Sequence, residues 1–352
     1  MNKLFAIRFK SARLLNGFSL QDLANKLNSK VSRQALHRYE KGEVVPDSEM
    51  IGLLSEAMNI RPDYFFRDTQ VELGAIEYRK LKRMPTKEEH KVIEQTREYL
   101  SRYLELEEIL GLENKFINPL ASFETIVEYE QVNRAANLLR AKWEMGKDPI
   151  FNVVELLEDK HVKVVKIDAD LSFDGMQTWV NGNIPVIAYN INIEEKPDRI
   201  RFTLLHELAH LLLKFDDSLT DHQIETLCHQ FSGAMLFPDD TILEELGANR
   251  KRLSIQELGS IKKQYGISMQ AIVMRALVCN IVNENYTKQF FNMLKQMGWK
   301  VDEPIAYDGV EGSNRFDQLL YRALAEEQIS MSKAAALKNQ KLADFRQQTL
   351  LV

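Results

Sequence analysis

The chain has 352 residues, of which 45% are hydrophobic and 28% are charged, and its formal net charge is -5. This length and composition suit two or three globular domains, and no apolar run reaches the length that a membrane-spanning helix needs. Arg8 and Lys10 interrupt the stretch in which a secretory signal would be apolar, so we expect a cytoplasmic protein with no membrane partner. Cys228 and Cys279 are the only cysteines, which excludes a disulfide scaffold.

Charge is unevenly distributed along the chain. Residues 1–67 contain eleven Lys/Arg and seven Asp/Glu, a net charge of +4, which leaves -9 for the remainder. A basic head on an acidic body predicts that only the head contacts nucleic acid.

Residues 1–67 carry the start and stop signals of about five short helices. Ser19 and Asp22 form an S-x-x-D cap before an apolar run, while Ser32 begins a later helix that Gly42 ends. We therefore predict a small all-α domain.

Three segments of this domain carry a family resemblance: LQDLA at 20–24, SRQAL at 32–36 and YEKG at 39–42. Together they resemble the helix-turn-helix domain of the XRE/Cro repressor family, although the turn at 28–31 is about two residues longer than usual. The resemblance implies that the third helix enters the major groove of a double-stranded DNA operator, where the residues expected at base edges are Arg33 and Gln34. The residues expected to hold phosphates are Arg38, Gln21 and Lys41. The alternative is a helical bundle used for protein contacts.

Residues 68–116 are dense in charge and predict a helical linker. After Pro85, apolar residues recur at helical spacing, and Thr86 with Glu89 is expected to cap a long helix. Its charges favour a solvated face, but its Tyr/Leu stripe leaves a homodimer as the alternative. A basic cluster could add phosphate contacts; its members are Arg79, Lys80, Lys82 and Arg83.

Residues 117–280 form the next predicted domain, which begins with helices and then changes period. Residues 161–167 read as a strand, and the two segments that flank Asn181-Gly182 read as a hairpin with a type I′ turn. Pro185 confines its strand to a sheet edge or to the first residues of the strand. Such an edge offers a place where an extended peptide can add a strand.

The segment 201–215, RFTLLHELAHLLLKF, contains an HExxH motif on an apolar helix. His206 and His210 are four residues apart, so their imidazoles project from one face and can bind the same Zn²⁺. Glu207 lies beside that position, where its carboxylate can act as a general base on water. The alternative is a pair of buried histidines with other partners.

A zinc ion that keeps one position open for water needs a third protein ligand. The next helix, which Asp221 can cap, carries Glu225, our choice for this ligand; His222, His229 and Asp221 are the alternatives. Cys228 lies among apolar residues, which favours a core position.

The segment from Glu225 to Ser232, followed by MLFP at 235–238, resembles the helix that follows HExxH in the ImmA/IrrE family of metallo-endopeptidases. Cys228 and His229 stand where the family has Ala-Asn. Fusion of this peptidase to an XRE head is a known architecture of the family, and Gly298-Trp299 with Glu303-Pro304 fits its longer members. The resemblance implies a zincin-like fold and protein substrates, often a repressor.

The remainder is predicted to be helical. Two helices over 254–279 belong to the body of the peptidase family, with a second DNA reader as the alternative, and 281–352 is expected to contain a C-terminal helical pair. The predicted fold class is α+β, mostly α: a helix-turn-helix bundle, a helical linker, a metallopeptidase domain with a small sheet, and C-terminal helices. We predict no cofactor other than Zn²⁺.

Two functional hypotheses follow. The first is a DNA-binding regulator with a zinc-dependent endopeptidase domain that cleaves a partner protein. The second is a repressor, or the antitoxin of a toxin-antitoxin pair, whose metal domain binds a toxin or senses a signal without cleaving.

Overall fold

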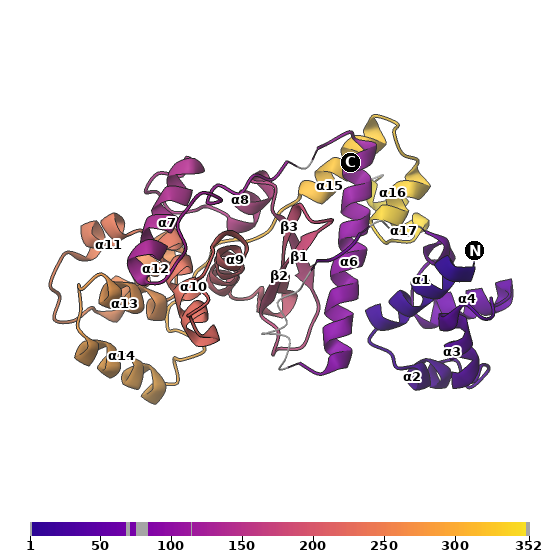
Figure 1. Cartoon of the computed structure of the whole chain (residues 1–352), viewed down its shortest axis with the longest axis horizontal. Coiled ribbons are helices and arrows are strands. Elements are labelled where there is room, and N and C mark those ends of the chain that lie inside the picture. The colour runs from indigo at the N-terminus through magenta and orange to yellow at the C-terminus, as the bar shows by residue number, and fades with distance from the viewer. Residues whose placement is uncertain (1, 68–70, 75–83, 114, 350–352) are drawn as a thin grey trace. The chain divides into compact units, whose positions relative to one another are not determined.

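The computed structural model describes the chain except residues 1, 68–70, 75–83, 114 and 350–352. It contains two compact units (Figure 1). The first comprises Met1–Glu113, Ile167–Phe173 and Arg315–Val352, and the second comprises Asn114–Lys166 and Asp174–Asn314. The described residues are mostly helical and include one three-stranded sheet, so the predicted fold class is confirmed.

The head of the first unit is a bundle of short helices. They are α1 (Asn2–Leu15), α2 (Leu20–Lys26), α3 (Arg33–Lys41), α4 (Ser48–Ala57) and the 3-10 helix η1 (Pro62–Phe66). Ser19 and Asp22 form the expected capping box of α2, and Gly42 ends α3 in the left-handed conformation, with φ 69°. Phe5, Phe9 and Leu36 are buried in the shared core. The turn between α2 and α3 uses positive φ angles at two consecutive residues, Asn28 and Ser29.

The long helix α6 (Thr86–Ile109) follows the head. Its N-cap is Pro85, and no side chain caps it, so the expected cap from Thr86 and Glu89 was wrong: Thr86 is already the first helical residue. The basic cluster of Arg79, Lys80, Lys82 and Arg83 lies outside the described residues.

The C-terminal segment of the first unit forms three helices rather than a pair. They are α15 (Arg315–Ala325), α16 (Met331–Leu337) and α17 (Leu342–Thr349). Tyr103 and Leu106 of α6 are buried in a common core with Leu320 and Phe345. The Tyr/Leu stripe of α6 is therefore covered within the same chain, which removes the reason for expecting a homodimer through it.

The sheet has the strand order β1-β3-β2. Its strands are β1 (Lys163–Ile167), β2 (Gly175–Val180) and β3 (Ile184–Asn190). β2 and β3 are antiparallel, with Val180 paired to Ile184, and the φ angles of Asn181 and Gly182 are 50° and 76°, as a type I′ turn requires. Pro185 is the second residue of β3, which is the central strand, so β2 rather than β3 is the edge of the hairpin.

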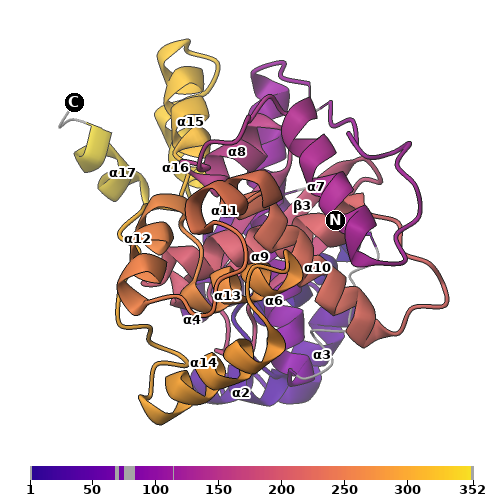
Figure 2. The same cartoon turned by 90° about the vertical axis from the view of Figure 1, so that its left-hand side faces the viewer.

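The remaining helices of the second unit surround two long ones, α9 (Pro197–Leu212) and α10 (Asp221–Leu236). α9 contacts β2, β3 and α10, and Figure 2 looks onto α11 to α14 of this unit. The others are α7 (Tyr129–Lys142), α8 (Val153–Asp159), α11 (Asp239–Leu246), α12 (Ile255–Tyr265), α13 (Met269–Val278) and α14 (Glu284–Gln296). Within the described ranges, no helix combines the length and apolar character needed to cross a bilayer.

Candidate metal centre

Helix α9 presents both histidines of the HExxH motif to one point. Pro197 begins the helix where no intrahelical N–H is needed, and the leucines around the motif are buried. His206 and His210 are four positions apart in the sequence, and their Nε2 atoms lie 3.2 Å apart. The side chain of His206 is 3% exposed. The sequence therefore turns two imidazoles toward one buried position, as the helical spacing predicts.

Helix α10 crosses α9 and supplies a carboxylate to the same point. The Glu225 oxygens lie 3.3 Å from Nε2 of His206 and 3.2 Å from Nε2 of His210. The Glu225 side chain is 31% exposed, so the group opens to solvent on the side of α10. Among the described residues, His206, His210 and Glu225 are the one group of side chains arranged to hold a metal ion.

These separations fit a zinc site. Ligand atoms held about 2.0–2.1 Å from a tetrahedral centre lie about 3.3 Å from one another. The two Nε2 atoms are 3.2 Å apart, and the Glu225 carboxylate places Oε2 3.3 Å from His206 and Oε1 3.2 Å from His210. Two imidazole nitrogens and one carboxylate also form a ligand set that catalytic zinc uses, with a fourth position left open. The donors thus fit Zn²⁺ in both chemistry and spacing.

Glu207 is buried between α9 and the sheet, with 2% of its surface exposed. A Cβ atom added to Gly175 of β2 would lie 3.5 Å from Cγ of Glu207 and 2.8 Å from Cγ2 of Thr203. The absence of a side chain at Gly175 therefore allows β2 to approach the face of α9 that carries Glu207. The sequence contains this glycine but does not predict that it packs against Thr203 and Glu207 of α9.

The other candidate ligands on α10 are not part of this group of three side chains. Thr220 rather than Asp221 is the N-cap, and both Asp221 and His222 are exposed in the first turn. Cys228 is fully buried in the apolar core. His229 is exposed, and its ring centroid lies 4.6 Å from that of His206 and 5.8 Å from that of Phe202.

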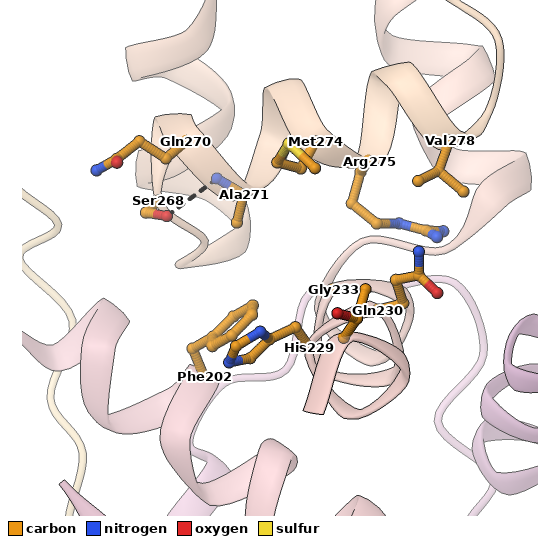
Figure 3. Close-up of a pocket in the computed structure, with 11 residues that line it drawn as sticks. Phe202, His229, Gln230, Gly233, Ser268, Gln270, Ala271, Met274, Arg275 and Val278 are labelled. Atoms are coloured by element: carbon orange, nitrogen blue, oxygen red, sulfur yellow. Dashed lines mark hydrogen bonds between the residues drawn. The ribbon is translucent and has the colours of Figure 1, made fainter. Parts of the chain in front are cut away.

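A cavity of about 570 Å³ opens on the far side of His229 (Figure 3). Its walls come from α9, α10 and α13 and are largely apolar, with Phe202, Ala271 and Met274 among them. Figure 3 shows Phe202 beside the ring of His229, across from Ala271. α13 is thus part of the site's surroundings, which disfavours its alternative role as a second DNA reader. The cavity adjoins the predicted metal ligands through the ring of His229.

Arg275 forms the inner wall of this cavity. Its guanidinium donates to the Phe237 carbonyl oxygen at 3.2 Å and also to Tyr129 and Asp239. Burial raises the pKa of the nearby Cys279 to about 11, so this cysteine is a neutral thiol at physiological pH. Arg275 was not predicted; its only sequence signal is a charge within an otherwise apolar helix.

The strand edge that the sequence offered for peptide binding is β2. Five of its six residues are buried. The cavity beside His229 is therefore the more open surface next to the predicted metal ligands.

The predicted DNA-contacting residues all lie on the surface of the head. The first two residues of α3 are Arg33 and Gln34. The exposed residues of this set are Gln21, Arg33, Gln34, Arg38 and Lys41. Arg38 pairs with Glu43 at 3.4 Å across an exposed surface, a contact that a phosphate can replace at little cost.

Comparison with known proteins assigns both regions. Residues 9–65 match a family model described as helix-turn-helix, and residues 157–277 match one described as an IrrE N-terminal-like domain. The chain joins an XRE-type helix-turn-helix domain to an IrrE-like peptidase domain. Both predicted resemblances are confirmed, and the IrrE-like match includes all of α9 and α10.

Two curated proteins are similar to part of this chain. The radiation response metalloprotease IrrE of Deinococcus radiodurans is 38% identical over 68 residues, which are 16% of this chain and 21% of that protein. The protein of the same name from Deinococcus deserti is 39% identical over 64 residues, 15% of this chain and 23% of that protein. The chain thus spans less than a quarter of the length of these relatives. An IrrE-like metallopeptidase domain implies a metal cofactor.

Proposed function

We propose that this protein is a DNA-binding regulator whose IrrE-like domain is a zinc-dependent endopeptidase that cleaves a partner protein. The observation that carries the proposal is that Nε2 of His206 and Nε2 of His210 lie 3.2 Å apart and each lies 3.2–3.3 Å from one of the two carboxylate oxygens of Glu225. A structural histidine pair would not need a carboxylate from a second helix at tetrahedral spacing.

The residues divide the chemistry between them. His206, His210 and Glu225 would hold Zn²⁺, which, when bound, acidifies water and polarises a carbonyl group. Glu207 would take a proton from the attacking water and return it to the leaving amine. Its burial beside Gly175 limits the motion of this carboxylate.

The cavity beside His229 would receive one side chain of the substrate. Its apolar walls favour an apolar side chain, and its position places the bound residue next to the three proposed ligands. β2 contacts α9 and is largely buried. A substrate peptide could pair with the edge of β2 only if the segments that bury this strand moved.

The helix-turn-helix domain would bind an operator and so bring the peptidase domain close to it. In such domains the N-terminal part of the recognition helix contacts base edges, which gives these roles to Arg33 and Gln34, with Arg38, Gln21 and Lys41 on phosphates. A repressor bound near the same operator would be a substrate within reach. We propose the cytoplasm as the compartment in which DNA and such a substrate meet.

The test uses purified full-length protein and proteins encoded beside its gene. We expect about one zinc per chain and cleavage of one such protein, lost on chelation and in Glu207→Gln. Glu207→Gln should keep its zinc and its DNA binding, because the variant removes a proton acceptor and no ligand. A fully active Glu207→Gln protein would refute the mechanism. Full zinc with no cleavage of any neighbour would instead favour the non-cleaving repressor or antitoxin.

A further inference from the structure

A second cavity, of about 310 Å³, lies within the first unit, far along the chain from the HExxH motif. Its walls come from three separate segments: η1 at the end of the head, α6, and α16 near the C-terminus. The lining residues with charge are Arg61, Asp63, Arg67, Glu98 and Lys333. Tyr64, Phe66 and Ala336 add apolar surface. The helix-turn-helix and IrrE-like matches leave this cavity without an assigned role.

One carboxylate at the cavity wall forms ion pairs with three guanidinium groups. Glu98 accepts from Arg8 at 2.9 Å, and its other oxygen lies 3.7 Å from Arg67 and 3.6 Å from Arg102. Arg8 and Glu98 are both buried. A single negative charge cannot neutralise three cations, and the low dielectric of a buried site makes the surplus costly.

The second carboxylate is shared as well. Glu105 pairs with both Arg67 and Lys333. In the described part of the chain, the four cations Arg8, Arg67, Arg102 and Lys333 thus contact two carboxylates, while Arg61 and Asp63 pair with each other at 2.8 Å. These four cations and two carboxylates leave about two positive charges in excess in the ionic network, while the side chains that line the cavity itself carry a net charge of about +1. Burial lowers the pKa of Arg102, Glu98 opposes this shift, and Arg67 adds to it.

We propose that this cavity binds the phosphate group of a small molecule through Arg67 and Lys333. A phosphate monoester carries close to two negative charges at neutral pH, which would balance the excess of this ionic network. Arginine and lysine are the usual partners of phosphate, and Arg67 presents a planar fork of donors. The remaining volume, beside Tyr64 and Phe66, has room for a small organic group.

The phosphate belongs to a free small molecule rather than to the DNA backbone. A duplex cannot enter a cavity of this size, and the residues proposed to contact DNA lie on α2 and α3, none of which lines the cavity. Because the walls include η1 of the head, α6 and α16, a bound phosphate ties the head to these helices.

Inorganic phosphate is the probe that tests the site. Calorimetry on the full chain at about pH 7.5, with potassium chloride of equal ionic strength as the reference, should show saturable binding. Lys333→Gln should weaken it about tenfold, the loss expected for one charged hydrogen bond. Ala336→Asp removes no contact but adds a negative charge to the wall, and it should weaken binding at least as much.

Lys338→Gln is the matched control. Lys338 caps the same helix and also forms an ion pair, with Asp317, but it does not line the cavity. The Lys338→Gln variant should bind phosphate with the affinity of the wild type. His210→Ala should also retain phosphate binding, which would separate this cavity from the proposed metal centre. Three results would overturn the proposal: no saturable binding, equal weakening in Lys338→Gln and Lys333→Gln, or loss of binding in His210→Ala. Displacement of phosphate by a short DNA duplex would identify the backbone as the source and would overturn it too.

Discussion

The side chains of Arg201 and Glu311 form an ion pair in which both groups are 0% exposed. Arg201 lies one and a half turns before His206 on α9, and Glu311 lies in the segment that leads out of the second unit. The other Glu311 oxygen accepts from the backbone N–H groups of Val153 and Val154 at 2.7 and 3.3 Å. One carboxylate therefore joins the proposed metal helix to the start of α8.

Removing Glu311 should destabilise the second unit. Glu311→Ala leaves the Arg201 guanidinium buried without its anion and two backbone donors without an acceptor, so we expect a loss of about 3–5 kcal/mol in the free energy of unfolding. Urea denaturation followed by circular dichroism measures it. Glu244→Ala is the control, because Glu244 pairs with Lys147 on an exposed surface where solvent screens the charges. Equal effects of the two substitutions would contradict the role of Glu311.

Gly175→Ala should disturb the contact between β2 and α9. The added Cβ would lie 2.8 Å from Cγ2 of Thr203, and such overpacking costs about 1–3 kcal/mol. Because Cγ of Glu207 lies 3.5 Å from the added Cβ, cleavage should fall further than stability alone explains. Thr203→Ser removes the clashing methyl group but leaves the Ala188 carbonyl oxygen 3.1 Å from the new Cβ, so the double variant should recover part of both losses. Gly52→Ala, with no atom within 4 Å of the new Cβ, should be neutral or slightly stabilising.

The metal helix and its partner could be predicted because their signals are local. His206, Glu207 and His210 are fixed on one helix by a four-residue spacing, and the choice of Glu225 used the helix that follows directly. The contacts that hold this helix in place could not be predicted. Arg201 and Glu311 are 110 residues apart, and no periodicity links them. The only indication of this contact in the sequence was the charge of Arg201 within the largely apolar segment 201–212.

The same limit applies to α6 and to the cavity in the first unit. The Tyr/Leu stripe of α6 correctly indicated a buried face, but its covering helices begin at Arg315, some 200 residues later. Sequence alone left a second copy of the chain as the alternative. Glu98, counted among the solvated charges of α6, is instead buried against Arg8 of the head.

Zinc should stabilise the wild-type protein by binding only its folded form. We expect a higher thermal midpoint with zinc than with a chelator, and a much smaller shift in Glu225→Gln. Loss of a direct ligand should weaken zinc affinity by more than the about 10–100-fold cost of losing an outer partner. His229→Ala should keep the shift, because His229 contacts the ring of His206 rather than the donor group. A normal shift in Glu225→Gln and none in His229→Ala would reassign the third ligand.

The head should lose stability in acid through Asp22. Hydrogen bonds from the backbone and side chain of Ser19 lower the pKa of Asp22 from 3.8 to about 2, with a further contribution from Lys87. Since the folded pKa is the lower one, the stabilisation is complete above the unfolded pKa and disappears as pH falls through the folded value. Asp22→Asn should therefore be less stable than wild type at about pH 5, and the difference should be much smaller at about pH 2, where the Asp22 carboxyl is about half protonated. Urea midpoints of the head at both pH values check this, and a difference independent of pH would contradict it.

Filling the cavity beside His229 should separate substrate binding from metal binding. Ala271 lines this cavity from α13, so Ala271→Trp should occupy part of its volume and exclude a substrate side chain. We expect at least about a tenfold fall in kcat/KM for the cleaved partner, equivalent to about 1.4 kcal/mol of lost binding. Zinc per chain should stay unchanged, because Ala271 contacts none of the three proposed ligands. Leu243→Trp, an equal enlargement at an exposed site on α11, controls for the added surface. If Ala271→Trp cleaves as fast as Leu243→Trp, the substrate side chain lies elsewhere.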